Sequence, residues 1–133
     1  MYSKYVFSGH ESFSCRMLWP IKGYDYINDG NSFNDPNSVI MLGVGKNMVA
    51  SIRYWLKALG LTEHDKPSTL AKYLFDEAQG KDRYLESLGT LWLLHFLLVV
   101  LNEATLYNIL FLRYQKERKQ FAKEQVLNFV KRL

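Results

Sequence analysis

LGVGKNMVASIRYWLKALGL, residues 42–61, begins with a turn of two glycines and a lysine and continues as an amphipathic helix. From Met48 to Leu59, apolar residues recur at i, i+4, i+7 and i+11, which predicts a helix with one buried stripe. Gly60 stands where helices often end. Before this helix, the glycine–lysine turn could hold a nucleotide phosphate, hold a DNA phosphate, or only connect two helices.

A nucleotide-binding loop does not fit these residues. A Walker A loop needs GxxxxGK followed by Ser or Thr, whereas Ile40 occupies the first glycine position and Asn47 follows the lysine. A dinucleotide-binding fingerprint needs a third glycine at Met48. Both patterns fail, so the sequence favours a connection between helices or a DNA contact.

A helix-turn-helix agrees better with the sequence. Ser38 can act as the N-cap of a short helix that ends near Leu42, the glycines supply the turn, and the amphipathic helix follows, so the unit covers about 38–60. Residues 61–68 (LTEHDKPS) predict a loop or a small β-wing. The predicted fold class is therefore mostly α: a helical domain with a helix-turn-helix, winged or plain, followed by a helical hairpin.

The face of the second helix opposite its apolar stripe carries polar and cationic side chains. Lysine neutralises phosphates, and asparagine and arginine hydrogen-bond base edges. We therefore expect Lys46 and Lys57 on phosphates and Asn47 and Arg53 near base edges, with Tyr54 beside them. An ordinary solvated helix face, or a protein-contact face, has the same composition, and the segment alone leaves these alternatives open.

The rest of the chain predicts further helices and two units. Additional helices are expected over residues 12–27, with Met17 on an apolar stripe and a break or bend at Pro20, and over 69–75, 90–101, 104–114 and 121–133. The leucine-rich run 90–101 is predicted to be a buried helix, and Trp19, Trp55 and Trp92 are expected to pack in the core. Residues 1–114 would form the helical domain, and 115–133 a basic linker and the first helix of a further unit.

Charge is unevenly distributed along the chain. The net charge is +4, but residues 113–133 hold seven cations against two carboxylates, so residues 1–112 sum to −1. Any DNA affinity of the main domain must therefore come from one local basic face. The run RYQKERKQ (113–120) either contacts DNA without sequence preference or is a solvated helix end.

Other groups give weaker indications of chemistry. His10-Glu11 resembles the start of a zinc-binding HExxH, but Ser14 replaces the second histidine. His95 lies among leucines and is interpreted as a core residue, and Cys15 as a partly buried, inert thiol. Four carboxylates between two predicted helices match no nuclease motif and are interpreted as caps and loop charges; they are Asp76, Glu77, Asp82 and Glu86. No catalytic residue, metal site or cofactor is predicted.

The expected location is the cytoplasm. A single cysteine cannot form an internal disulfide, and the first residues lack the apolar core of a signal peptide. The run 91–101 has about half of the roughly 20 apolar residues that cross a bilayer. We therefore expect no membrane partner.

Three segments together resemble the domain-of-unknown-function family numbered 4007: FSGHESF (7–13), LGVGKNMVASIRYWLKALGL (42–61) and DRYLESLGTLWLLHFLL (82–98). The resemblance implies a companion of bacterial DNA-modification and phage-defence operons, alongside enzymes that place sulfur in the DNA backbone. It also implies a link to a DNA-nicking component and members longer than this chain. It brings no established catalytic residues.

The first hypothesis is a DNA-binding helix-turn-helix module of such a system, with double-stranded DNA and proteins of the same operon as partners. The alternatives are a protein-interaction scaffold that docks a partner enzyme, and part of a DNA-nicking enzyme. The sequence does not reveal the preferred DNA sequence, the oligomeric state or the partner proteins.

Overall fold

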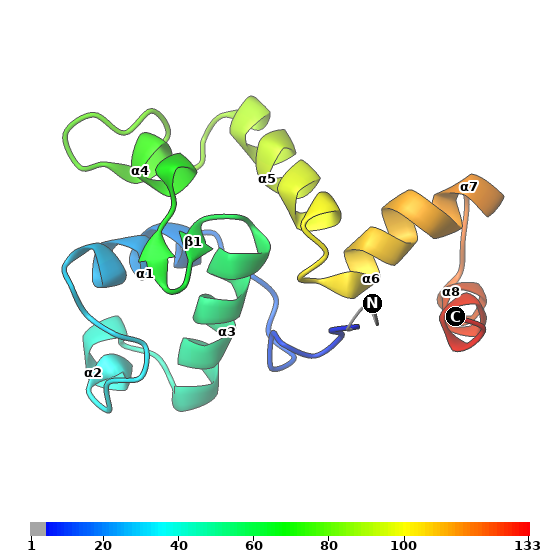
Figure 1. Cartoon of the computed structure of the whole chain (residues 1–133), viewed down its shortest axis with the longest axis horizontal. Coiled ribbons are helices and arrows are strands. Elements are labelled where there is room, and N and C mark those ends of the chain that lie inside the picture. Colours follow the sequence, from blue (N-terminus) through cyan, green and yellow to red (C-terminus); the bar gives the residue numbers. More distant parts are fainter. Residues whose placement is uncertain (1–4) are drawn as a thin grey trace.

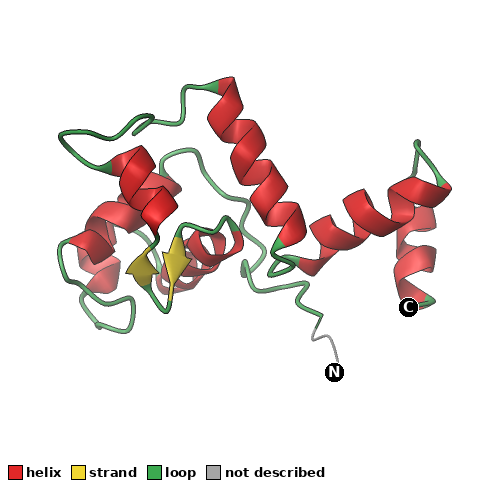
Figure 2. Cartoon of the chain, turned by 45° about the horizontal axis from the view of Figure 1, so that its top comes forward, coloured by secondary structure: helices red, strands yellow, loops and turns green. Residues whose placement is uncertain are grey.

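The computed structural model describes residues 5–133 and is mostly α-helical, as predicted (Figures 1 and 2). In chain order its elements are α1 (Trp19–Asn28), α2 (Ser38–Leu42), α3 (Lys46–Ala58), β1 (Thr62–Glu63), β2 (Lys66–Pro67), α4 (Thr69–Phe75), α5 (Leu88–Val100), α6 (Thr105–Asn108), the π-helix η1 (Ile109–Tyr114), α7 (Gln115–Glu117) and α8 (Lys123–Lys131). The elements up to α4 gather on one side of the molecule, and those from α6 to α8 extend away on the other.

The first helix begins later than the sequence predicted. Residues 12–18 are not helical, and α1 starts at Trp19, with Pro20 in its first turn. The expectation of a helix that runs from residue 12 through Pro20 is therefore wrong. Proline is favoured in the first turn because the N–H that it lacks has no intrahelical partner there. Met17, expected on an apolar stripe, is 67% exposed.

The predicted helix, turn and helix lie at the expected residues. Gly43 takes a left-handed conformation (φ 67°) and its N–H bonds to the carbonyls of Val39 and Ile40, which ends α2. This φ suits glycine because it has no Cβ to clash. The Nζ of Lys22 donates to the Leu42 carbonyl at 2.9 Å and satisfies a further acceptor at that helix end. The N-cap of α2 is Asn37 rather than the expected Ser38.

Helix α3 ends where Gly60 predicted it. Gly60 has a φ of 73°, and the N–H of Leu61 returns to the Leu56 carbonyl at 2.8 Å, an arrangement typical of glycine-terminated helices. The chain then forms the β1–β2 hairpin, in which Glu63 pairs with Lys66. His64 and Asp65 between the strands both have positive φ, as a type I′ turn requires.

The core lies among α1, α3 and α4. Ile52 and Phe75 are fully buried, and the rings of Tyr24 and Phe75 lie 5.5 Å apart. Burying one such side chain contributes about 1.5–3 kcal/mol. Trp19 and Trp55 are buried, as predicted. This core holds α3 with one side covered and the opposite side open.

Helix α5 forms as predicted, but the expectation that it is buried is wrong. Only three of its side chains are buried, Leu94, Leu98 and Val99. Trp92 and Phe96 are 64% and 60% exposed, so Trp92 is not a core residue. Hydrophobicity alone does not choose the buried side of a helix that is apolar all round, and here α5 touches the body along one flank only.

We call residues 105–133 the C-terminal arm. A continuous helical rod, Thr105–Glu117, is bent by 96° from α5, and α8 folds back against the rod (Figure 1). Phe129 of α8 packs edge-to-face on Tyr114, at a centroid distance of 5.2 Å. Among residues 5–133 no single helix meets the length and apolarity needed to cross a bilayer, whereas α5 and the rod meet them only as a bent pair.

Candidate nucleic-acid interface

Four of the five side chains predicted to meet DNA lie on the side of α3 that faces away from the core, whereas Tyr54 packs partly against the core. Lys46, Asn47 and Lys57 are exposed, and Arg53 and Tyr54 are partly buried. The buried residues of α3 occupy its opposite side because a helix returns to the same face every three to four residues. The structure thus brings these four residues onto one surface, with small Ala50 exposed among them.

Arg53 joins α3 to the β-hairpin. Its Nε donates to Asp65 Oδ1 at 2.9 Å, and its Nη2 donates to the second oxygen of the same carboxylate. Its Nη1 also donates to Asn34 Oδ1 at 3.2 Å. This bidentate geometry fixes the guanidinium and the hairpin relative to each other. Both partners remain about 40% exposed, so water and salt weaken the pair.

Lys57 is also paired. Its Nζ lies 3.3 Å from Glu103 Oε2, and Glu103 belongs to the connection between α5 and the arm. The Tyr54 hydroxyl donates to the Glu103 carbonyl at 3.5 Å. Burial raises the pKa of Tyr54 to about 12, with Tyr107 and the Glu103 carboxylate adding to the effect. Tyr54 is therefore a neutral donor at physiological pH. Within residues 5–133, Lys46 is the cation of this face that has no ion pair.

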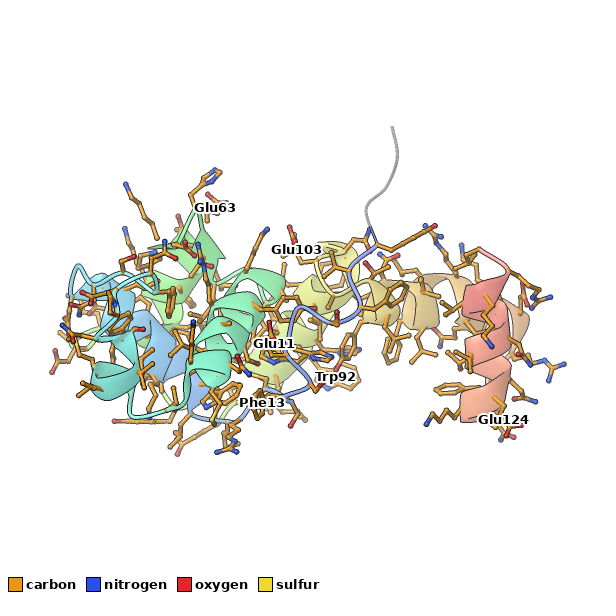
Figure 3. The ribbon with its side chains drawn as sticks, turned by 90° about the horizontal axis from the view of Figure 1, so that it is seen from below. Glu11, Phe13, Glu63, Trp92, Glu103 and Glu124 are labelled. Carbon is orange, nitrogen blue, oxygen red and sulfur yellow. The ribbon has the colours of Figure 1, made fainter. Side chains whose placement is uncertain are left out.

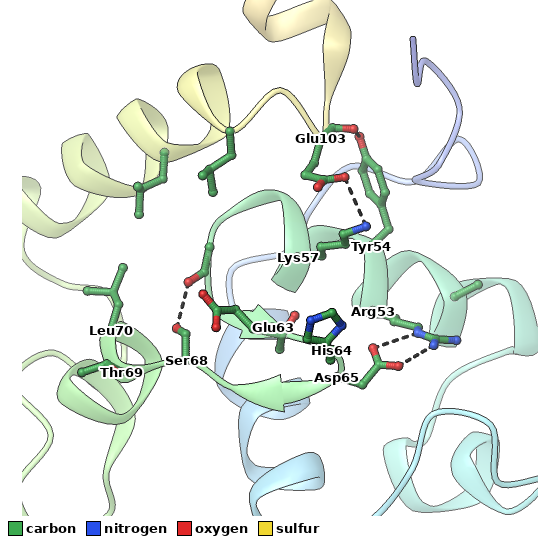
Figure 4. A pocket seen from close by; sticks show the side chains of 15 residues that line it. Arg53, Tyr54, Lys57, Glu63, His64, Asp65, Ser68, Thr69, Leu70 and Glu103 are labelled. Carbon is green, nitrogen blue, oxygen red and sulfur yellow. Dashed lines mark hydrogen bonds and ion pairs between the residues drawn. The ribbon is translucent and has the colours of Figure 1, made fainter. Parts of the chain in front are cut away.

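A groove of about 1080 Å³ runs beside the paired half of α3 (Figure 4). It lies between α3, the hairpin, the start of α4 and the end of α5. In the close-up Arg53 points toward Asp65, and Lys57 points toward Glu103. The groove is lined by the cations Arg53 and Lys57 and by the carboxylates of Glu63, Asp65 and Glu103. It therefore lacks the strong positive potential that attracts DNA phosphates.

The FSGHESF stretch (7–13) packs against Tyr54 and Trp55 of α3. The imidazole of His10 stacks on Trp55, at a centroid distance of 5.8 Å, and its Nδ1 accepts a hydrogen bond from the Ser12 N–H at 2.9 Å. The Trp55 Nε1 donates to the Phe13 carbonyl at 3.0 Å. These packing and backbone contacts tie the stretch to α3, and Figure 3 labels its residues Glu11 and Phe13.

The acidic residues between α4 and α5 make local backbone contacts. Asp76 accepts the N–H groups of Ala78 and Gln79, and Asp82 accepts those of Glu86 and Ser87. Burial alone would raise the pKa of Asp82, but hydrogen bonds from the Glu86 and Ser87 amides and from the Thr90 hydroxyl hold that pKa below its usual value. Within residues 5–133, no three His, Cys, Asp or Glu side chains are placed to share a metal ion.

Cys15 and His95 occupy apolar surroundings. Burial raises the pKa of the Cys15 thiol to about 11, in agreement with the predicted inert thiol. His95 is partly buried, and its ring meets Phe111 edge-to-face at 4.8 Å and lies 5.9 Å from Trp92. His64, for which the sequence offered no partner, sits in the exposed hairpin turn.

Sequence reasoning missed the carboxylates that face the cations of α3. Asp65 had a usable signal, because a hairpin directly after α3 must lie against that helix. Glu103 had none, because only the tertiary fold brings the end of α5 to Lys57. The fold and the site together define a mostly α-helical domain that presents one polar helix face beside a β-hairpin.

This chain belongs to the family described as "Protein of unknown function (DUF4007)", whose model matches residues 7–133. It is similar to the "Magnesium ion-bound SspB crystal structure", with a TM-score of 0.63 and 39% identity over 70% of this chain and 30% of that chain. The "SspB crystal structure" gives a TM-score of 0.63 and 40% identity, over 69% and 31%. The chain thus spans less than a third of the length of these relatives. Among curated proteins, none matches it.

Proposed function

We propose that this chain is a winged helix-turn-helix module that binds double-stranded DNA. In this proposal α2 and α3 are the helix-turn-helix, α3 enters the major groove, and the β1–β2 hairpin is the wing. The observation that carries the proposal is the open side of α3 next to the hairpin, with Lys46, Asn47 and Ala50 exposed along it.

The unpaired half of α3 makes the first contact. Lys46 neutralises a backbone phosphate at the start of the helix, and Asn47 has the amide that pairs with an adenine edge. Ala50 is small enough to let the helix approach the bases. These three positions lie within the first two turns of α3, where recognition helices commonly contact DNA.

Arg53 and Lys57 contribute in a different way. Exposed ion pairs contribute only about 0–1 kcal/mol, so a DNA phosphate can replace Glu103 at Lys57 at little cost. Arg53 holds the wing through both oxygens of Asp65, so it orients the hairpin and offers its remaining edge to DNA. Tyr54, a neutral hydroxyl donor, stands next to them.

We also propose that the longer protein acts in a bacterial DNA-modification or phage-defence system, in the cytoplasm, with partner proteins of the same operon. Membership of the family and the similarity to SspB support this setting. A nicking activity of the longer protein remains a prediction, and we assign no catalytic residue to this chain.

The test is a fluorescence anisotropy titration of a labelled duplex with the wild type and Lys46→Ala/Asn47→Ala. Loss of a base contact and a phosphate contact should weaken binding at least about fivefold, because a base contact alone contributes about 1–3 kcal/mol. The matched control, Lys81→Ala/Asn28→Ala, removes the same groups from exposed positions off α3 and should bind like the wild type. Equal affinities for all three proteins would refute the proposal.

A second candidate function, docking of a partner protein, is favoured by one specific observation. Leu88, Trp92 and Phe96 recur every four residues along α5 and are 69%, 64% and 60% exposed. A contiguous apolar surface of this kind commonly marks a protein contact. A pull-down that resists nuclease and high salt, and that Trp92→Glu/Phe96→Glu abolishes, would support docking. Retention of the partner by that variant would exclude this face.

A further inference from the structure

The C-terminal arm carries most of the cationic charge that has no carboxylate partner. Its cations are all exposed: Arg113, Lys116, Arg118, Lys119, Lys123, Lys131 and Arg132. Within residues 5–133, none of them takes part in an ion pair, whereas Arg53 and Lys57 of α3 both do. The arm has only Glu117 and Glu124 to offset its charge.

The far end of the arm concentrates this charge at a fixed place. The rod ends at Glu117, and Arg118 is in an extended conformation that turns the chain back toward α8. Three cations, Lys116, Arg118 and Lys119, stand at this turn, which we call the basic tip. Figures 1 and 3 show the arm reaching away from the rest of the molecule, so its end is open to a large ligand.

Aromatic packing keeps the basic tip in position. Tyr114, 3% exposed, meets Phe121 at 5.7 Å and Phe129 at 5.2 Å, in both cases edge-to-face. These contacts join the rod, the turn and α8 on the inner side of the arm. Tyr114 and Phe129 are buried, Phe121 is 51% exposed, and the three cations of the turn are all exposed. A rod of 13 residues is about 20 Å long, so the basic tip stands well away from the end of α5.

We propose that the basic tip binds the phosphate backbone of the same DNA that α3 contacts, and that the arm, rather than α3, supplies most of the charge-dependent affinity. The inference rests on the proposed function for the identity of the polyanion. It follows from the charge distribution, because α3 offers one unpaired lysine and the arm offers seven unpaired cations.

Counterion release allows a quantitative prediction of how the salt dependence of DNA binding should change. Each phosphate that a protein neutralises changes the slope of log K against log salt by about 0.9. Removal of two cations from the basic tip should therefore flatten the slope by about 2 and weaken binding more at low salt than at high salt. Because phosphate contacts carry no base information, the loss should be the same for duplexes of different sequence.

The experiment compares Arg118→Ala/Lys119→Ala with Lys72→Ala/Lys81→Ala, which removes one exposed lysine from α4 and one from the connection between α4 and α5. Anisotropy titrations of one labelled duplex at four salt concentrations give the slope for each protein, and circular dichroism verifies equal helicity. We expect a slope reduced by about 2 for the first variant and unchanged for the second. Equal slopes for the first variant and the wild type would overturn the inference.

The outcomes separate this inference from the proposed function. If Lys46→Ala/Asn47→Ala weakens binding and the basic-tip variant does not, α3 contacts DNA and the arm inference is wrong. If only the basic-tip variant weakens binding, the arm is a polyanion site and the role of α3 is wrong. If the wild type does not bind duplex, both proposals fail.

Discussion

The region around α1–α4 and the region from α5 to α8 use their apolar and charged residues in opposite ways. In the first region, Ile52 and Phe75 are completely enclosed, and each ion pair found within residues 5–133 involves a residue of this region. In the second, Trp92 and Phe96 stay exposed, and the buried cluster of the arm contains only Ile109, Tyr114 and Phe129. The first region contains most of the main core, and the second leaves several large apolar side chains and all the cations of the arm exposed.

The largest expected effect tests the difference in packing. Ile52→Ala should lower the free energy of unfolding by about 2–5 kcal/mol, because it leaves a cavity in a fully buried site. Phe96→Ala should change it by about 0.5 kcal/mol or less, because the ring is mostly exposed. Urea denaturation followed by circular dichroism measures both. Equal losses would mean that α5 is as enclosed as α3.

The next expected effect is a difference in thiol reactivity between a cysteine of the first region and one placed in the second. Cys15 has a pKa of about 11 because of burial, whereas a cysteine placed at the exposed Gln120 should titrate near 8.5. Only the thiolate reacts, so Cys15 should be modified at least about tenfold more slowly at pH 8. Its rate should keep rising beyond pH 10, while that of Gln120→Cys (in a Cys15→Ser background) levels off above about pH 9. Parallel pH profiles in a colorimetric thiol assay would contradict this account.

Substitutions at the N-caps of α4 and α8 should have smaller effects on helix stability. Ser68 Oγ accepts the Ala71 N–H at 3.1 Å and caps α4, whereas the N-cap residue of α8 is Ala122, which has no side-chain acceptor. Ser68→Ala should cost about 1 kcal/mol, and Ala122→Ser should stabilise α8 by about 0.5–1 kcal/mol. Hydrogen exchange at the amides of each helix reports both effects locally. Slower exchange in α8 is expected for Ala122→Ser, and unchanged exchange there would refute the assignment.

The smallest effect concerns the contact between the two regions. Glu103, in the connection between α5 and the arm, pairs with Lys57 of α3. Glu103→Gln should release that lysine, raise duplex affinity by a few-fold and steepen the salt slope by up to about 0.9. Glu77→Gln, an exposed carboxylate off this face, is the control. If Glu103→Gln binds no better than Glu77→Gln, Lys57 does not reach a phosphate.

Local patterns predicted the central part of the fold well. The spacing of apolar residues in α3 and the glycines on either side defined its ends, because a helix of strong periodicity with clear end signals depends little on the rest of the chain. Thr69–Phe75 was predicted with the observed bounds for the same reason. By contrast, Pro20 was interpreted as a break or bend within a longer helix, because the start of α1 has no capping side chain to mark it.

Burial and charge pairing were harder to predict because both depend on contacts between distant residues. Nothing local in the leucine-rich run distinguishes Leu94, which is buried, from Trp92, which is exposed. Likewise the five candidate residues of α3 could be chosen by helical periodicity, but the carboxylate of Glu103 becomes their neighbour only in the folded chain. Helical periodicity thus predicted which residues share the polar face of α3, and the structure showed that Glu103 lies beside them.

The most direct test of the central claim maps backbone amide shifts while an unlabelled duplex is added to ¹⁵N-labelled protein. The account predicts the largest shifts along Lys46–Ala58 and in the β1–β2 hairpin, with a second set at residues 116–119. Shifts confined to α5, or saturable binding that leaves α3 unperturbed, would show that the open side of α3 does not face DNA.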